Sequence, residues 1–128
     1  MNVLLLDDDV CILTLLRNAF VRWGYEVAVY TDAAQCPVYC SQTCPCNLVN
    51  QCPDLILTDV RMPSVDGVKF VEELRRKGCK CPKIGMMSGD WGEKELQKAA
   101  YLGTTVFFKP FHIPSLRLWV EQNQKRIA

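Results

Sequence analysis

Four short apolar runs of the chain are each followed directly by side chains that could do chemistry. In chain order these are Asp7 to Asp9, Asp59, Ser88 and Lys109. Carboxylates, a hydroxyl and an ammonium group together suit a divalent cation and a phosphoryl group. The residue types therefore predict phosphate chemistry beside a metal ion, provided that the fold brings the four places together.

The apolar runs predict the strands that would do so. Strands are predicted at residues 2–7, 25–30, 54–58, 83–87 and 106–108. The first run is continuously apolar, which is typical of a parallel strand covered on both faces. Helices are predicted from Asp9 to Gly24, from Asp66 to Lys77, from Glu93 to Leu102 and from about Pro114 onward. This alternation indicates an α/β fold, whose ligands bind at the carboxyl ends of the parallel strands.

The first helix and the last helix carry predictions about packing. Val10, Leu13, Leu16 and Phe20 recur at helical spacing and are predicted to face the core. On the last helix Leu118 stands beside Trp119, and core packing is favoured over a homodimer contact, which stays open as the alternative.

Convergence of Asp7, Asp8 and Asp59 would place three carboxylates together. Without a cation such a cluster is repulsive and forces at least one group to take up a proton. Magnesium or manganese accepts this kind of oxygen ligand. Lys109 would help to neutralise the charge between an attacking carboxylate and a phosphoryl group, and Ser88 could donate a hydrogen bond to a phosphoryl oxygen.

Four motifs carry a resemblance to a known family. They are Leu-Asp-Asp-Asp at 6–9, Thr-Asp-Val-Arg-Met-Pro-Ser-Val-Asp-Gly at 58–67, Met-Ser-Gly at 87–89 and Lys-Pro-Phe at 109–111. At these motifs the chain resembles the receiver domains of bacterial two-component response regulators, over nearly its whole length. The resemblance implies a flavodoxin-like, doubly wound (βα)5 fold with a five-stranded parallel sheet in the order 2-1-3-4-5. It also implies one receiver domain over residues 1–128.

The resemblance further implies roles for single residues. Asp59 would be the phosphoryl acceptor, and Ser88 and Lys109 would contact the phosphoryl group. The Mg²⁺ (or Mn²⁺) ligands would be Asp7, Asp8, Asp59 and the backbone carbonyl of Arg61. The expected function is that of a phosphorylated signalling switch rather than an enzyme, with at most slow self-dephosphorylation. Its expected partners are a sensor histidine kinase or phosphotransfer protein and a downstream output domain or protein.

The chain departs from the family pattern at the switch position. The family commonly has an aromatic residue three positions before the lysine, and this chain has Val106. An aliphatic side chain cannot swing as a ring does. The expected path from Ser88 to the face formed by the fourth helix, the fifth strand and the last helix therefore lacks its usual aromatic residue.

A cysteine-rich insert at about residues 36–52 is the second departure. If a helix persists there, Cys36, Cys40 and Cys44 share one face. Convergence of thiols at the amino ends of the strands would allow a zinc or iron–sulfur site formed by Cys44, Cys46, Cys52, Cys79 and Cys81. The favoured interpretation is that these cysteines are small buried hydrophobic residues together with a few exposed thiols, and that Cys11 on the first helix is structural. The alternative function is a receiver-like binding module regulated by metal or redox state.

Composition limits the remaining classes. A chain of 128 residues with 49% apolar content can form one core, and a net charge of +1 without a basic run argues against nucleic-acid binding. Short, charge-interrupted apolar stretches and the lack of a signal pattern predict a cytoplasmic protein with reduced or metal-bound thiols. A phosphohydrolase is disfavoured because nothing in the sequence positions a second base to activate water.

Overall fold

The protein is described here by a computed structural model that covers residues 2–36, 53–79, 81–110 and 112–127. Five parallel strands form one sheet in the order β2-β1-β3-β4-β5, which confirms the predicted doubly wound α/β fold. The strands are β1 (Asn2–Leu6), β2 (Glu26–Tyr30), β3 (Leu55–Asp59), β4 (Lys83–Ser88) and β5 (Thr105–Phe108). The helices of the described residues are α1 (Val10–Arg22), η1 (Ala33–Gln35), α3 (Gly67–Arg76), α4 (Glu93–Tyr101) and α5 (Ile113–Ile127).

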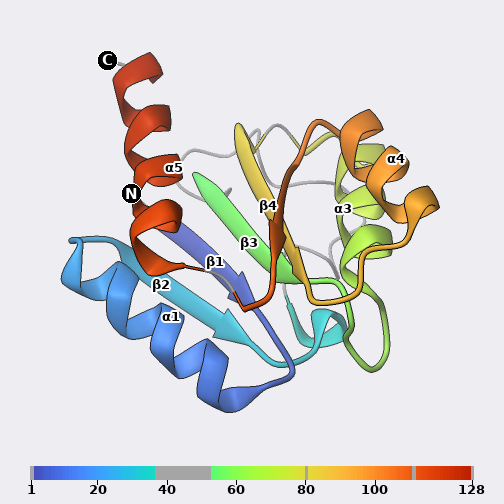
Figure 1. Ribbon diagram of the computed structural model, residues 1–128, viewed down its shortest axis with the longest axis horizontal. Helices are drawn as coiled ribbons and strands as arrows, with labels where there is room; N and C mark the ends of the chain where they lie inside the picture. Colours follow the sequence, from blue (N-terminus) through green and yellow to red (C-terminus); the bar gives the residue numbers. More distant parts are fainter. Residues whose placement is uncertain (1, 37–52, 80, 111, 128) are drawn as a thin grey trace.

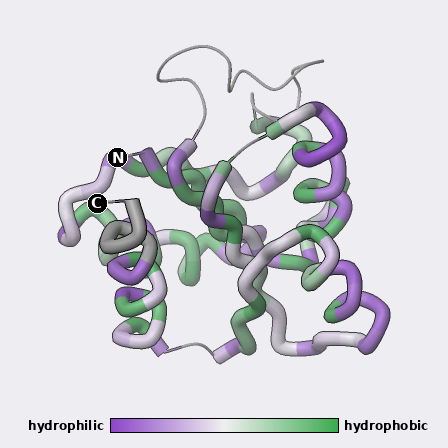
Figure 2. Tube along the Cα trace, turned by 90° about the horizontal axis from the view of Figure 1, so that it is seen from above, coloured by the Kyte–Doolittle hydropathy of each residue, from purple (hydrophilic) through white to green (hydrophobic). Residues whose placement is uncertain are grey.

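Helices cover both faces of the sheet (Figure 1). The α-helices α1 and α5 pack on one face through Leu13, Leu16, Phe20, Leu116 and Val120. The helices α3 and α4 pack on the other through Phe70, Val71, Leu74 and Ala99. The strands between the two layers are largely hydrophobic (Figure 2). Because each central strand is buried on both faces, its sequence is a continuous apolar run rather than an alternating one.

Strand register brings the polar residues to one edge. Leu6 pairs with Thr58, and Asp59 pairs with Met87. The chain therefore leaves β1 at Asp7 beside the end of β3, and β4 ends at Ser88 beside Asp59. The carboxyl edge of the sheet holds all of the polar clusters, as the sequence predicted.

Two of the helices that begin at this edge, α1 and α3, are capped by aspartates. The Asp9 carboxylate accepts hydrogen bonds from the N–H groups of Cys11 (2.9 Å) and Ile12 (3.3 Å). At the other end of α1, Gly24 follows the helix with a φ of 93°, a backbone conformation that is strained for residues with a side chain. The Asp66 carboxylate accepts from the N–H of Lys69 at 2.8 Å, which confirms that Asp66 begins α3.

Several packing predictions were wrong. Val10 is 61% exposed and Cys11 is exposed, because they begin α1 at the edge of the sheet, so the core-facing stripe begins at Leu13. Leu118 is 59% exposed, so it does not pack in the core. Its neighbour Trp119 turns inward, and the centroid of its ring lies 5.0 Å from that of Phe107.

The insert is described only at its start. After η1, Cys36 is buried and has extended backbone dihedrals (φ −79°, ψ 122°), so no helical face begins at this residue. Cys40, Cys44, Cys46 and Cys52 lie outside the described residues. Within the part of the chain that the structure describes, no helix combines the length and apolarity needed to cross a membrane.

Candidate functional site

Three carboxylates meet at the carboxyl edge of the sheet, as predicted. Asp7 follows β1, Asp8 is beside it, and Asp59 ends β3. One oxygen from each of the three lies within 4.8 Å of the others. Asp7 and Asp59 are 0% and 4% exposed, whereas Asp8 is open to solvent. Such a set of hard oxygen ligands fits a divalent cation such as Mg²⁺.

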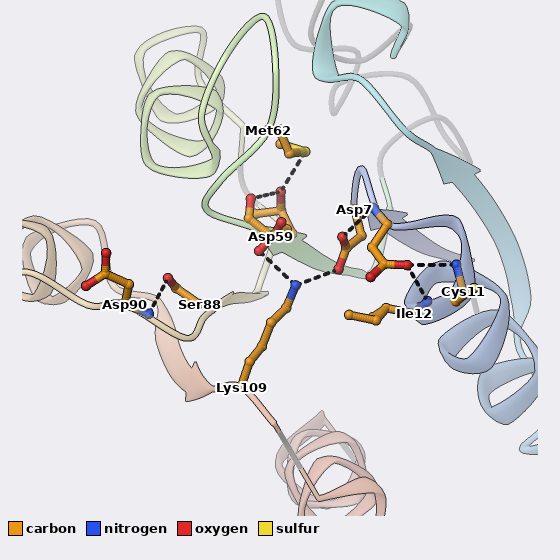
Figure 3. A network of polar contacts seen from close by, with 10 residues as sticks. Asp7, Cys11, Ile12, Asp59, Met62, Ser88, Asp90 and Lys109 are labelled. Atoms are coloured by element: carbon orange, nitrogen blue, oxygen red, sulfur yellow. Dashed lines mark hydrogen bonds and ion pairs between the residues drawn. The ribbon is translucent and has the colours of Figure 1, made fainter.

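Lys109 bridges the two buried carboxylates. Its Nζ lies 3.0 Å from Oδ2 of Asp7 and 3.1 Å from Oδ1 of Asp59 (Figure 3). Its backbone N–H donates to the carbonyl of Ser88 at 2.9 Å, which continues the pairing of β5 with β4 and aims the side chain at the cluster. The peptide bond to Pro110 is cis.

The electrostatics of the cluster are unbalanced. Burial, followed by the neighbouring Asp7 carboxylate, raises the pKa of Asp59 from an ordinary 3.8 to about 6, although Lys109 acts in the opposite direction. Burial also raises the pKa of Asp7. For Lys109, burial acts to lower the pKa, but the hydrogen bonds to Asp7 and Asp59 outweigh it and the pKa is raised. One ammonium group does not neutralise the negative charge of three carboxylates. A divalent cation at the same place would neutralise it.

This imbalance predicts that the stability of the protein depends on pH when a chelator keeps the site free of metal ions. Because the folded state raises the pKa of Asp59, the folded protein binds this proton more tightly than the unfolded chain does. The free energy of unfolding should therefore fall as the pH rises from about 4 to above 6, by about 1 to 3 kcal/mol from this group. Urea denaturation across this pH range measures the change.

Asp59→Asn is the test variant for this dependence, because it keeps the shape of the side chain and removes its charge. It should flatten the curve and be more stable than the wild type at pH 7.5 in the chelator. The matched control is Asp90→Asn, because Asp90 has a side chain that is 93% exposed, and this variant should follow the wild type. An Asp59→Asn protein that is less stable than the wild type at pH 7.5 would contradict the prediction.

Ser88 and Arg61 lie at the site, but their side chains make other contacts. Ser88 is 1% exposed, and its Oγ accepts a hydrogen bond from the N–H of Asp90 at 3.0 Å. The guanidinium of Arg61 pairs with both carboxylate oxygens of Glu95, at 2.8 Å and 2.9 Å, and donates to the carbonyl of Asp90 at 2.9 Å. The loop that carries the predicted carbonyl ligand is thus attached to the first turn of α4.

Gly67 is a positioning residue that appears in the sequence analysis only as the last residue of the motif at 58–67. Its N–H donates to the carbonyl of Val60 at 2.8 Å, which closes the loop after β3. A Cβ at this position would collide with the carbonyl oxygen of Asp59 and lie 3.0 Å from its carbonyl carbon. The glycine in the motif after Asp59 was the sequence feature that could have indicated this role. Its close approach to the Asp59 carbonyl is evident only from the folded loop.

The described cysteines do not support a thiolate metal site. Cys79 and Cys81 are 4% and 1% exposed in the core on the α3 side. Burial raises the pKa of the Cys81 thiol to about 12, which keeps it protonated. Among the described residues, the group found with metal-ligand geometry is the carboxylate cluster. Cys44, Cys46 and Cys52 lie outside the described residues, so the favoured interpretation of buried structural thiols holds for the two that are described.

The fold and the site together define an α/β domain with an acidic, lysine-bridged pocket at the carboxyl edge of its sheet. The chain matches the response regulator receiver domain family over residues 3–121. It therefore belongs to that family, which comprises the regulatory phosphoacceptor domains of two-component systems.

Curated relatives support the assignment. The chain is 30% identical over 126 residues to the nisin biosynthesis regulatory protein NisR of Lactococcus lactis subsp. lactis, covering 98% of this chain and 51% of that protein. It is 26% identical over 121 residues to the regulatory protein AtoC of Escherichia coli, covering 94% of this chain and 24% of that protein. The chain thus spans about half of the first relative and about a quarter of the second.

Solved structures show the same fold. The receiver domain of the Francisella response regulator 1452 superposes with a TM-score of 0.80 at 24% identity, covering 99% of this chain and 98% of that one. The chemotaxis protein CheY4 of Vibrio cholerae gives 0.72 at 23% identity, with the same coverage of both chains.

Proposed function

We propose that this protein is a phosphoryl-accepting signalling switch of a two-component system, with Asp59 as the acceptor. The observation that carries the proposal is the bridge that Lys109 forms between Asp7 and Asp59 inside the carboxylate cluster. A buried acceptor, a neighbouring acidic residue and an ammonium group are assembled where a phosphoryl group could enter from solvent past the exposed Asp8. Membership of the receiver family supports the same role.

In the proposed reaction an Asp59 oxygen attacks the phosphorus of a phosphohistidine on the donor protein. The new bond joins that oxygen to phosphorus, the phosphorus–nitrogen bond breaks, and its electron pair stays on the imidazole, which is then protonated. Asp7, Asp8, Asp59 and the Arg61 carbonyl would hold Mg²⁺, which supplies charge neutralisation at the phosphoryl oxygens when bound. Lys109 can move its ammonium from Asp59 to the phosphoryl group, and Ser88 can turn its hydroxyl toward it.

The partners follow from this chemistry. The phosphoryl donor would be a sensor histidine kinase or a phosphotransfer protein, and the phosphorylated form would act on an output domain or a separate protein. Two relatives of the chain, a biosynthesis regulatory protein and a regulatory protein, agree with such an output. Residues 1–128 would form one receiver domain with a regulatory rather than an enzymatic role.

Phosphorylation of the purified protein tests the proposal. Incubation with Mg²⁺ and a small phosphoryl donor should add the mass of one phosphoryl group to the wild-type chain, with an acid-stable and base-labile linkage. Asp59→Asn should not be modified, because an amide is a poor nucleophile at this position. A chelator should abolish the modification. An unmodified wild type, or equal modification of both proteins, would refute the proposal.

A further inference from the structure

The switch position of this chain has an aliphatic side chain, but an aromatic ring lies close by. Val106 is half-buried on β5 and packs against the core cluster on the α4 side of the sheet. Trp91, in the loop between β4 and α4, packs against the same cluster. A large ring is therefore present on the α4 side of the sheet, and it comes from the loop that follows Ser88.

Trp91 is attached to β5. Its indole Nε1–H donates to the backbone carbonyl of Phe107 at 3.0 Å, and its ring meets that of Phe108 edge-on, with the ring centroids 6.5 Å apart. In the described sheet β5 is an edge strand that pairs with β4 alone. The indole thus adds a hydrogen bond to an edge-strand carbonyl and joins the β4–α4 loop to the strand that leads to Lys109.

The beginning of the same loop is connected to the phosphoryl site. The Ser88 hydroxyl points toward Asp90 and away from Asp59 (Figure 3), and it accepts from the N–H of Asp90. If this hydroxyl turns toward a phosphoryl group on Asp59, the N–H of Asp90 loses its acceptor. An N–H group that loses its partner gains by finding another one, which favours a shift of the backbone next to Trp91.

The far end of the loop is held in place. The Glu95 carboxylate accepts from the N–H of Gly92 at 3.1 Å and from the guanidinium of Arg61. These contacts fix the first turn of α4 to the loop after β3. A change at Ser88 therefore acts on the backbone of residues 89–91, directly beside the indole, where Arg61 also holds the carbonyl of Asp90 at 2.9 Å.

We propose that Trp91 transmits the phosphorylation state of Asp59 to β5, in place of an aromatic side chain at position 106. When Ser88 turns toward the phosphoryl group, the loop shifts, the indole leaves the Phe107 carbonyl, and the ring moves relative to Phe108. This inference rests on the proposed function and adds the path by which the modification reaches the surface. Phe108 is 61% exposed, so a change in its contact with Trp91 alters a side chain that a partner can touch.

The experiment separates capture of the phosphoryl group from its transmission. Intact mass measures phosphorylation, while tryptophan emission and amide hydrogen exchange over residues 104–110 measure the response. Trp91→Phe keeps a ring and removes the N–H donor. The matched control is Trp23→Phe, because Trp23 packs with the core cluster on the opposite face of the sheet. Trp91→Ala removes the ring as well, and circular dichroism checks that each variant is folded.

We expect phosphorylated wild type and Trp23→Phe to show changed emission and faster exchange over residues 104–110. Trp91→Phe and Trp91→Ala should reach the same phosphorylated mass and lose most of the exchange response. A phosphorylated wild type with unchanged emission and exchange would overturn the transmission step alone. So would a Trp91→Phe protein with the full wild-type response. A wild type that takes up no phosphoryl group would overturn both this inference and the proposed function.

Discussion

Replacing Gly67 by alanine should destabilise the protein and prevent phosphorylation of Asp59. The added Cβ would collide with the carbonyl oxygen of Asp59 and approach the Cα of Val60 to 3.0 Å. These atoms belong to the backbone, which cannot turn aside as a flexible side chain can. Relief requires a shift of the end of β3, which carries the acceptor, and overpacking of this kind costs about 1 to 3 kcal/mol.

The direction of the change in stability distinguishes the collision with Asp59 from an effect of helix propensity. Gly67 is the first residue of α3, and intrinsic helix propensity favours alanine over glycine by up to about 1 kcal/mol. A net loss of stability therefore reports the collision with Asp59. The control is Gly92→Ala at the start of α4, where a Cβ would meet the Glu95 carboxylate at an ordinary 3.5 Å and should change stability by less than about 1 kcal/mol. Chemical denaturation and phosphorylation assays measure both effects, and a Gly67→Ala protein that is as stable and reactive as the wild type would contradict the contact.

The carboxylate cluster was predictable from the sequence because each of its residues directly follows a recognisable strand. Asp7, Asp59 and Lys109 each follow an apolar run, and the carboxyl ends of parallel strands must meet at one edge. Residue type and strand order were then sufficient to place three chemical groups together. The same logic placed the starts of two helices at Asp9 and Asp66, which the structure shows as caps, since a cap depends on neighbours in sequence.

Features that depend on contacts distant in sequence were missed or misjudged. Leu118 is apolar, and only the packing of α5 shows that Trp119 takes the inward position instead. The link from Arg61 to Glu95 joins the loop after β3 to the first turn of α4, across 34 positions of the sequence. The role of Trp91 depends on a hydrogen bond to β5, which no pattern in its own loop indicates. Apolar periodicity gives the faces of elements, but not which of two adjacent side chains turns inward or which loops touch.

Replacing Lys109 by methionine should have the largest effect at the site itself. The side chain keeps a similar length, but the two buried carboxylates lose the ammonium that bridges them. Removing one partner of a buried ion pair leaves uncompensated charge and costs about 3 kcal/mol. Phosphorylation should be abolished or strongly slowed, because the ammonium group beside the transferred phosphoryl group is removed. The control is Lys98→Met, because Lys98 pairs with Glu72 on the surface and its loss should cost less than about 1 kcal/mol.

The pH dependence of this variant separates lost charge pairing from lost packing. Lys109 acts to lower the pKa of Asp59, so without it that pKa should rise above about 6. At pH 5 the Asp59 carboxyl group of the folded variant is then protonated, and this relieves its repulsion with Asp7. Raising the pH to 8 removes that proton, so the stability difference from the wild type should widen as the pH rises in a chelator. Mg²⁺ should restore much of the lost stability at pH 8 by neutralising the same carboxylates, without restoring phosphorylation. A deficit of equal size at pH 5 and pH 8 would mean that Lys109 stabilises the fold by packing instead.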